Sequence, residues 1–120
     1  MARVADQGGK WIRPAKRLAI YRRDAWRCVY CGERPHRKLL TLDHVKPHGS
    51  GGVCDNEATN LVTACRSCNS AKGRKTHREF LAWLRKKGVS TEGIAARVRA
   101  ATRKPIDRHL EWARKERGER

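Results

Sequence analysis

Asp43 and His44 are adjacent, and together they offer two side-chain types that metal-assisted hydrolysis needs. A carboxylate is a suitable ligand for a hard cation such as Mg²⁺ or Mn²⁺, and a neutral imidazole is a suitable base near pH 7. The dipeptide falls within residues 39–45, whose apolar and β-branched content predicts a short strand. Neighbours on a strand point to opposite faces, so one side chain can bind a metal while the other addresses a water molecule. Alone, the dipeptide is a weak motif, and a structural hydrogen-bonded pair is the alternative.

Four cysteines at two matched spacings are the most specific signal in the chain. Cys28 and Cys31 form one Cys-x-x-Cys pair, and Cys65 and Cys68 form a second. Each pair can supply half of a tetrahedral site, so we expect one structural zinc ion. The alternatives are four reduced thiols in a core, or redox chemistry, which would need only one pair in a thioredoxin-like context. The remaining cysteine, Cys54, makes the count odd, which argues against a framework of disulfides alone, and we take it as incidental.

Short predicted elements position these residues. Gly32 allows a tight turn after the first cysteine pair. A second strand is expected over 61–64, after a loop over 49–58. A helix is expected over 65–72, and Gly73 should end it.

A basic helix is predicted before the first cysteine pair. Pro14 can occupy its first position, and the helix is expected to reach about Trp26. Leu18 and Tyr21 fall on one face, and Ile20 lies off that face.

Three helices are predicted after the second cysteine pair. Thr76 and Glu79 have capping-box spacing at the start of a helix over 77–87. Another helix is expected over 91–103, and Pro105 can begin a further one. His77 lies inside the capping box with no constellation of other ligands, so we expect it at the surface.

The net charge of +17 and the sequence pI of about 10.7 indicate a polyanionic partner. The basic residues concentrate in the flanks, because residues 28–69 contain five Lys or Arg against four Asp or Glu. We therefore expect flanks that hold a nucleic-acid backbone; an anionic membrane or protein is the alternative. A solvated surface is the simpler interpretation of any single charge. The candidates for DNA contact are Lys16, Arg17, Arg22, Arg23, Lys72, Arg74 and Lys75.

The sequence has no N-terminal apolar segment typical of a secretory signal, and no apolar run of about 18 residues. We therefore expect neither secretion nor a membrane span. Paired Cys-x-x-Cys motifs in a reducing compartment more often bind metal than form disulfides. The expected location is the cytoplasm of a bacterium or of a phage-infected host cell.

The order and spacing of the motifs resemble the HNH endonuclease family in its zinc-containing form, over about residues 28–73. The matching motifs are Cys28-x-x-Cys31, Leu42-Asp43-His44-Val45-x-Pro47, Gly51-Gly52, Asn60-Leu61-Val62 and Cys65-x-x-Cys68-Asn69-x-x-Lys72-Gly73. The resemblance implies an α+β fold with a ββα-metal core, in which two short antiparallel strands and a helix surround one catalytic divalent ion. A Cys₄ zinc site would staple this core to the N-terminal basic helix, with further helices at the C-terminus.

The resemblance also implies roles for individual residues. His44 matches the general base, and Asp43 matches the carboxylate ligand of the catalytic metal. Asn60 matches the central asparagine that braces the loop and orients the base; a simple turn or cap residue is the alternative. Asn69 matches a metal-binding His or Asn, and its neutral amide oxygen favours a hard ion, Mg²⁺ or Mn²⁺; capping of the short helix is the alternative. His48 is a weaker candidate for contact with the metal or a phosphate.

The function that the resemblance implies is metal-dependent hydrolysis of DNA phosphodiester bonds, leaving 5′-phosphate and 3′-hydroxyl ends. Because no segment has a clear base-reading signature, we expect weak or shape-dependent specificity. The alternatives are a non-enzymatic zinc-stapled nucleic-acid-binding protein and an accessory factor that works with phage DNA-packaging proteins. We expect a nuclease domain over 14–88 with its core at 28–73. A basic, flexible lead over 1–13 would precede it, and a basic helical extension over 89–120 would follow.

Overall fold

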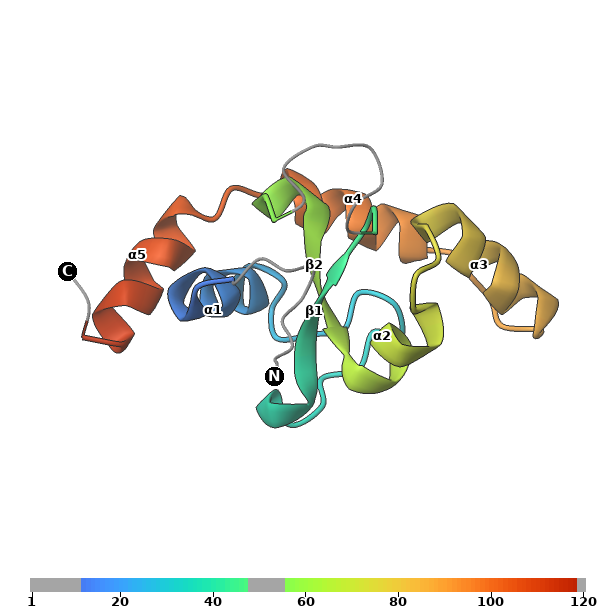
Figure 1. Ribbon diagram of the computed structural model, residues 1–120, viewed down its shortest axis with the longest axis horizontal. Helices are drawn as coiled ribbons and strands as arrows, with labels where there is room; N and C mark the ends of the chain where they lie inside the picture. The colour runs from blue at the N-terminus through green and yellow to red at the C-terminus, as the bar shows by residue number, and fades with distance from the viewer. Residues whose placement is uncertain (1–11, 48–55, 119–120) are drawn as a thin grey trace.

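A computed structural model describes residues 12–47 and 56–118 of the chain as a small sheet surrounded by helices (Figure 1). The elements in chain order are α1 (Pro14–Arg23), the 3₁₀ turn η2 (Arg37–Leu39), β1 (Leu40–His44), the 3₁₀ turn η3 (Ala58–Asn60), β2 (Leu61–Cys65), α2 (Arg66–Lys72), α3 (His77–Lys86), α4 (Ile94–Arg103) and α5 (Asp107–Glu116). Figure 1 shows α3 and α5 at opposite ends of the long axis. The architecture is α+β, as predicted.

The two strands are antiparallel neighbours, with Leu40 opposite Cys65 and His44 opposite Leu61. This register confirms both predicted strands to within a residue or two at their ends. It places His44 at the end of β1, and it places Cys65 where β2 passes directly into α2. Gly73 has a positive φ of 53° and ends α2, as the sequence predicted.

α1 packs on one face of the hairpin. Ile20 and Tyr21 of α1 form a buried cluster with Leu40, Leu42 and Leu61 of the two strands. Ile20 is fully buried, so the prediction that it lies off the packed face is wrong. The packed face is instead set by the strand residues that α1 meets.

α1 ends at Arg23, earlier than predicted. Ala25 and Trp26 have φ values of 60° and 59°, a left-handed conformation that stops the helix. The turn sends the chain toward the first cysteine pair. It also brings Trp26 within 6.4 Å, ring to ring, of Trp112 on α5, where the guanidinium of Arg22 lies 4.5 Å from the Trp112 ring. α5 therefore packs beside α1.

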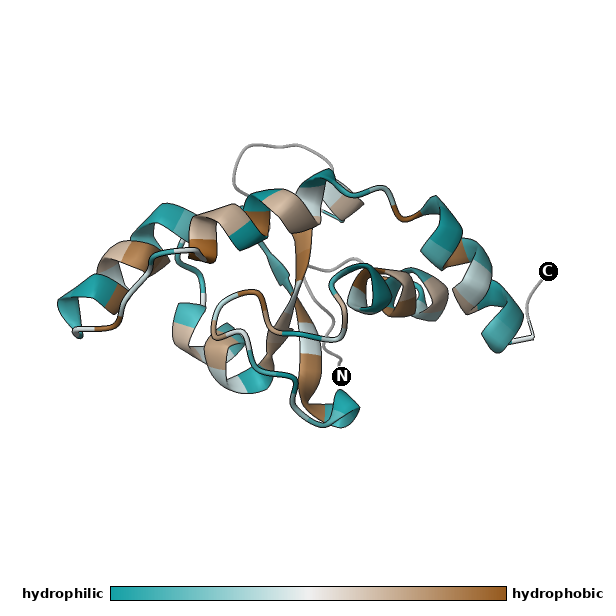
Figure 2. Ribbon diagram, turned by 180° about the vertical axis from the view of Figure 1, so that it is seen from behind, coloured by the Kyte–Doolittle hydropathy of each residue, from teal (hydrophilic) through white to brown (hydrophobic). Residues whose placement is uncertain are grey.

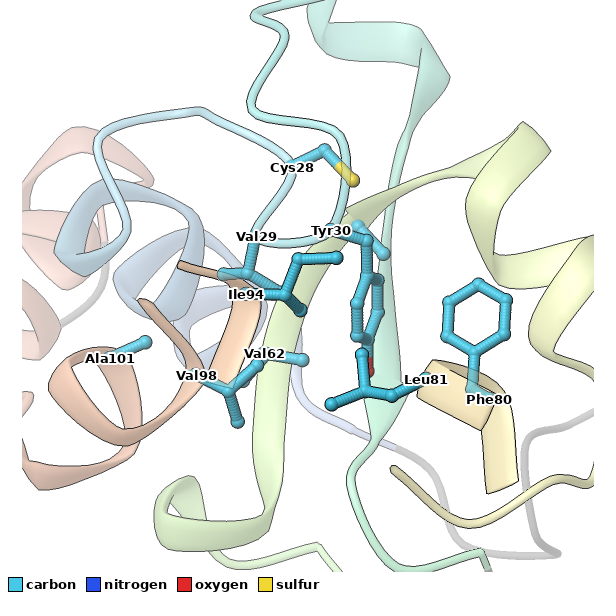
Figure 3. Packing of buried hydrophobic residues seen from close by; sticks show 10 residues of the cluster. Cys28, Val29, Tyr30, Val62, Phe80, Leu81, Ile94, Val98 and Ala101 are labelled. Atoms are coloured by element: carbon cyan, nitrogen blue, oxygen red, sulfur yellow. The ribbon is translucent and has the colours of Figure 1, made fainter. Parts of the chain in front are cut away.

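The cysteine turn, α3 and α4 pack on the other face of the hairpin. Figure 3 shows the Tyr30 ring beside Leu81 and Phe80, with Ile94 and Val98 of α4 next to Val62 of β2. These residues are the larger buried cluster of the described chain. Its members are Cys28, Val29, Tyr30, Val62, Ala64, Phe80, Leu81, Ile94, Val98 and Ala101.

Two further features fix the C-terminal helices. The capping box is present, because Thr76 Oγ1 accepts from the Glu79 amide at 3.1 Å and Glu79 Oε1 accepts from the Thr76 amide at 2.8 Å. Arg97 of α4 donates to the carbonyls of Val29 at 2.9 Å and Tyr30 at 3.2 Å. α4 is thus bonded to the cysteine turn, while the predicted domain division at residue 88 stays a prediction.

Hydrophilic residues predominate on α5, and the apolar residues of the hairpin lie at the centre of the molecule (Figure 2). Within residues 12–47 and 56–118, no helix has both the length and the apolar character that a bilayer span requires.

Candidate active site

The two cysteine pairs meet at one point. The Sγ atoms of Cys28, Cys31, Cys65 and Cys68 all lie within 4.8 Å of one another, and Cys31 Sγ is 3.9 Å from Cys65 Sγ. Thiolates bound to one zinc at ~2.3 Å are separated by about 3.8 Å at the corners of a tetrahedron. The amide N–H of Cys31 points at Cys28 Sγ (3.5 Å), and that of Cys68 points at Cys65 Sγ (3.4 Å). The four cysteines therefore fit a structural zinc ion.

The pKa values of three of these thiols, Cys28, Cys31 and Cys68, are strongly shifted. A hydrogen bond from Cys68 lowers the pKa of Cys28 to about 5, and the same contact raises the pKa of Cys68 far above its usual range. Burial raises the pKa of Cys31 to about 11. Four crowded thiols cannot all ionise without a counter-charge. A divalent cation would supply that charge and stabilise them as thiolates. Cys54 lies outside the described residues.

Asp43 points into the protein from β1. It is 4% exposed, and its Oδ2 accepts a 2.5 Å hydrogen bond from the Tyr30 hydroxyl. The ammonium of Lys72 lies 3.2 Å from Oδ2 and 3.4 Å from Oδ1. Burial raises the pKa of Asp43, while the positive charge of Lys72 and the Tyr30 hydrogen bond act against this rise.

Lys72 is therefore not a surface cation. It is 1% exposed, and its ammonium also donates to the His44 carbonyl at 2.9 Å. Because its three donors face Asp43 and β1 inside the protein, Lys72 does not fit the predicted DNA contact, and we correct that expectation. The sequence placed Lys72 on a helix, but it did not show that the helix turns this side chain inward.

The ammonium marks a place where oxygen atoms surround a cation. Both carboxylate oxygens of Asp43 and the carbonyl oxygen of His44 face it. Oxygen donors of this kind suit Mg²⁺ or Mn²⁺ as well as an ammonium group. Asn69, the second predicted ligand, is half-buried on α2, one turn before Lys72 and so on the same side of the helix. These oxygen atoms are of a kind that binds divalent cations, and the assignment of Asp43 and Asn69 as ligands of a catalytic metal stays a prediction.

His44 faces away from Asp43. Its Nε2 lies 2.8 Å from Asn56 Oδ1. An amide oxygen only accepts, so this contact selects the tautomer with hydrogen on Nε2 and leaves Nδ1 with the lone pair. The backbone carbonyl of Asn56 in turn accepts a hydrogen bond from the ammonium of Lys16 on α1. No sequence pattern pointed to Asn56, which lies in the loop predicted over 49–58.

Asn60 braces the chain that follows β1. Its Oδ1 accepts from the Lys46 amide at 2.9 Å, and its Nδ2 donates to the Lys46 carbonyl at 3.2 Å. The Asn60 carbonyl also accepts from the Val45 amide at 2.9 Å. These bonds hold the segment just after His44, while the role of Asn60 in orienting the base stays a prediction.

The candidates for DNA contact fall into two groups. Arg22 and Arg74 are exposed, and Lys16, Arg17 and Lys75 are half-buried. Arg23, in contrast, is 3% exposed, so its predicted contact with DNA is corrected here. Its guanidinium bonds the Asp24 carboxylate at 2.8 Å and the carbonyls of Ala58 (2.9 Å) and Leu61 (2.6 Å).

His77 is half-buried rather than at the surface as expected, and burial lowers its pKa. His48 lies outside the described residues.

The antiparallel hairpin, the following helix and the Asp-His pair form the arrangement of a nuclease-type domain, and the four-cysteine cluster beside them fits a zinc site. Residues 28–84 match the sequence model of a family described as HNH endonuclease. By sequence, residues 28–84 of the chain therefore form an HNH endonuclease domain.

The chain is also similar to a much longer protein. It is 31% identical over 86 residues to the CRISPR-associated endonuclease Cas9 of Corynebacterium diphtheriae. That match covers 63% of this chain and only 7% of the Cas9 protein. The similarity thus concerns a small part of the relative.

Proposed function

We propose that this protein is a metal-dependent endonuclease that hydrolyses phosphodiester bonds in DNA. The observation that carries the proposal is the divergence of Asp43 and His44 at the end of β1. Asp43 faces a cation among oxygen atoms, while the imidazole of His44 is held by Asn56 with Nδ1 as its basic nitrogen. One residue can therefore hold a metal while its neighbour accepts a proton.

In this proposal, Asp43 and Asn69 hold a single Mg²⁺ or Mn²⁺. The bound ion supplies positive charge to the scissile phosphate and to the departing 3′-oxygen. His44 Nδ1 accepts the proton of the attacking water. Asn60, through the backbone of Lys46, keeps the segment after His44 in place. The products are 5′-phosphate and 3′-hydroxyl ends, and the four cysteines hold zinc for stability alone.

DNA binding is assigned to the basic side chains that remain accessible. Arg22, Arg74 and the half-buried Lys16, Arg17 and Lys75 can reach phosphates, which carry no sequence information. Binding should therefore weaken steeply with salt and show little sequence preference.

A second candidate function is a non-enzymatic zinc-stapled DNA-binding protein, including an accessory role beside phage packaging proteins. One observation favours it: the charge of Asp43 is already balanced by Lys72, so the carboxylate needs no metal. The two functions differ in whether DNA is cut.

A cleavage assay with zinc-loaded protein, supercoiled plasmid and Mg²⁺ or Mn²⁺ distinguishes the two functions. The proposal predicts nicked or linear DNA that DNA ligase reseals, since ligase needs a 5′-phosphate beside a 3′-hydroxyl. Retarded but uncut plasmid at every concentration of either metal would favour the binding protein and contradict the proposal.

A further inference from the structure

Tyr30 connects the zinc site to the candidate catalytic carboxylate. It lies between Cys28 and Cys31, so the turn that carries two zinc ligands also carries this ring. The ring is 4% exposed and meets Phe80 of α3 edge to face, with 5.2 Å between ring centroids. Figure 3 shows the ring pointing from the cysteine turn along the hairpin, beside Leu81. The Tyr30 hydroxyl is therefore delivered to β1 by a rigid support.

The hydroxyl distinguishes the two oxygens of Asp43. Oδ2 accepts from Tyr30 at 2.5 Å and also lies 3.2 Å from the ammonium of Lys72. Oδ1 lies 3.4 Å from the same ammonium, at the outer limit of a hydrogen bond. Tyr30 thus fixes the rotation of the carboxylate through one oxygen and leaves the other as the better placed ligand for a metal.

The backbone of Tyr30 is held as well. Its carbonyl accepts from Arg97 of α4, and Val29 beside it accepts from the same guanidinium. A tyrosine hydroxyl is protonated near pH 7, so it can donate to the Asp43 carboxylate.

We propose that Tyr30 is a positioning residue. Its hydroxyl sets the orientation of the Asp43 carboxylate for the catalytic metal, and its place in the cysteine turn makes that orientation depend on an ordered zinc site. This inference rests on the proposed function in one respect: it takes Asp43 as a metal ligand. Partners of a ligating carboxylate of this kind commonly change metal affinity by about 10- to 100-fold when removed.

The test compares two conservative variants. Tyr30→Phe removes the hydroxyl and keeps the ring against Phe80. Tyr21→Phe is the matched control, because Tyr21 is also buried and its hydroxyl donates to a β1 group, the Leu40 carbonyl, at 3.3 Å. The probe is Mn²⁺, titrated into zinc-loaded protein and followed by the electron paramagnetic resonance signal of the free ion.

Wild type and Tyr21→Phe should bind Mn²⁺ with similar affinity, and Tyr30→Phe should bind it at least about 10-fold more weakly. Zinc content should be unchanged in all three. Equal affinities, or equal losses in the two variants, would overturn the positioning role. Failure of wild type to bind Mn²⁺ would overturn it too, because no metal site would exist to be positioned.

Plasmid nicking separates this inference from the proposed function. If wild type binds Mn²⁺ but cuts no DNA, the endonuclease proposal fails. The difference in Mn²⁺ affinity between Tyr30→Phe and Tyr21→Phe would still decide the role of Tyr30.

Discussion

Lys72 and Asp43 form an ion pair inside the protein, with Nζ 3.2 Å from Oδ2 and side-chain exposures of 1% and 5%. The pair joins α2 to β1 directly beneath the end of the strand that carries His44. A buried pair of this kind contributes little compared with apolar packing, but loss of one partner leaves an uncompensated charge. It therefore couples the stability of the fold to the ionisation of a candidate catalytic carboxylate.

Replacement of Lys72 by methionine should lower the free energy of unfolding at pH 7 by about 3–5 kcal/mol, since Asp43 would remain buried without a counter-charge. Lys75→Met is the control, because Lys75 lies after the end of α2, is only half-buried and donates to the Ala71 carbonyl of that helix. Urea unfolding measures both. A loss in Lys72→Met no larger than in Lys75→Met would contradict the structural role.

The pH dependence of that loss has a defined sign. The pKa of Asp43 is raised above its ordinary value of 3.8 by burial, and loss of Lys72 removes the charge that opposes the rise. The folded variant therefore binds the proton more tightly than the unfolded chain does. The contribution of Asp43 to the stability of the variant should be greatest below pH 3.8 and should decline as pH rises through the folded pKa. Relative to wild type, the destabilisation should shrink between pH 7 and pH 4.

Adjacent arginines on α1 should behave differently. Arg23→Ala removes the partner of the buried Asp24 carboxylate and should cost about 3–5 kcal/mol of stability. Arg22→Ala loses only an exposed contact with Trp112 and should cost about 1 kcal/mol or less. In DNA binding the order reverses: Arg22→Ala should reduce the slope of log affinity against log salt by about 1. Thermal melts and fluorescence anisotropy at several salt concentrations measure the two effects.

Removal of zinc should unfold the domain. Metal binding at such sites supplies about 10–16 kcal/mol of apparent free energy, which is comparable to the whole free energy of unfolding of a small domain. Purified protein should contain about one zinc per chain, and circular dichroism should show loss of structure when a strong chelator is added. Cys65→Ser should lose the metal, whereas Cys54→Ser should keep it. Full structure in metal-free protein would contradict the structural role of zinc.

Asn56 should affect catalysis more than folding. Asn56→Ala removes the acceptor that selects the Nε2–H tautomer of His44, so we expect the nicking rate to fall by about 10-fold or more. The exposed neighbour provides a control, since Glu57→Ala should leave the rate unchanged. Rates are measured with equal zinc content at saturating metal. Equal rates for the two variants would remove Asn56 from the site.

The sequence predicted the parts of this site that are carried by local patterns. The cysteine spacing identified the cluster, strand content placed Asp43 and His44, and the capping box at Thr76 set the start of α3. What it could not predict depends on contacts between distant segments. The inward direction of Lys72 and Arg23 follows from the buried carboxylates that they meet, and both look like surface cations in a basic sequence.

Asn56 and Tyr30 were missed for the same reason. Asn56 reaches His44 only after the chain returns through the loop between the strands. Tyr30 stands between two zinc ligands in the sequence, and its contact with Asp43 appears only when the cysteine turn packs on the hairpin.

The role of His44 as the base is tested most directly by one comparison, the nicking of supercoiled plasmid by zinc-loaded wild type, His44→Ala and His36→Ala with Mg²⁺ or Mn²⁺. His36 is the control because it is exposed and only caps a short turn through its Nδ1. Wild type and His36→Ala should nick at the same rate, and His44→Ala should be slower by about 10²- to 10⁴-fold while it still binds DNA. Equal nicking by His44→Ala and wild type would contradict the account.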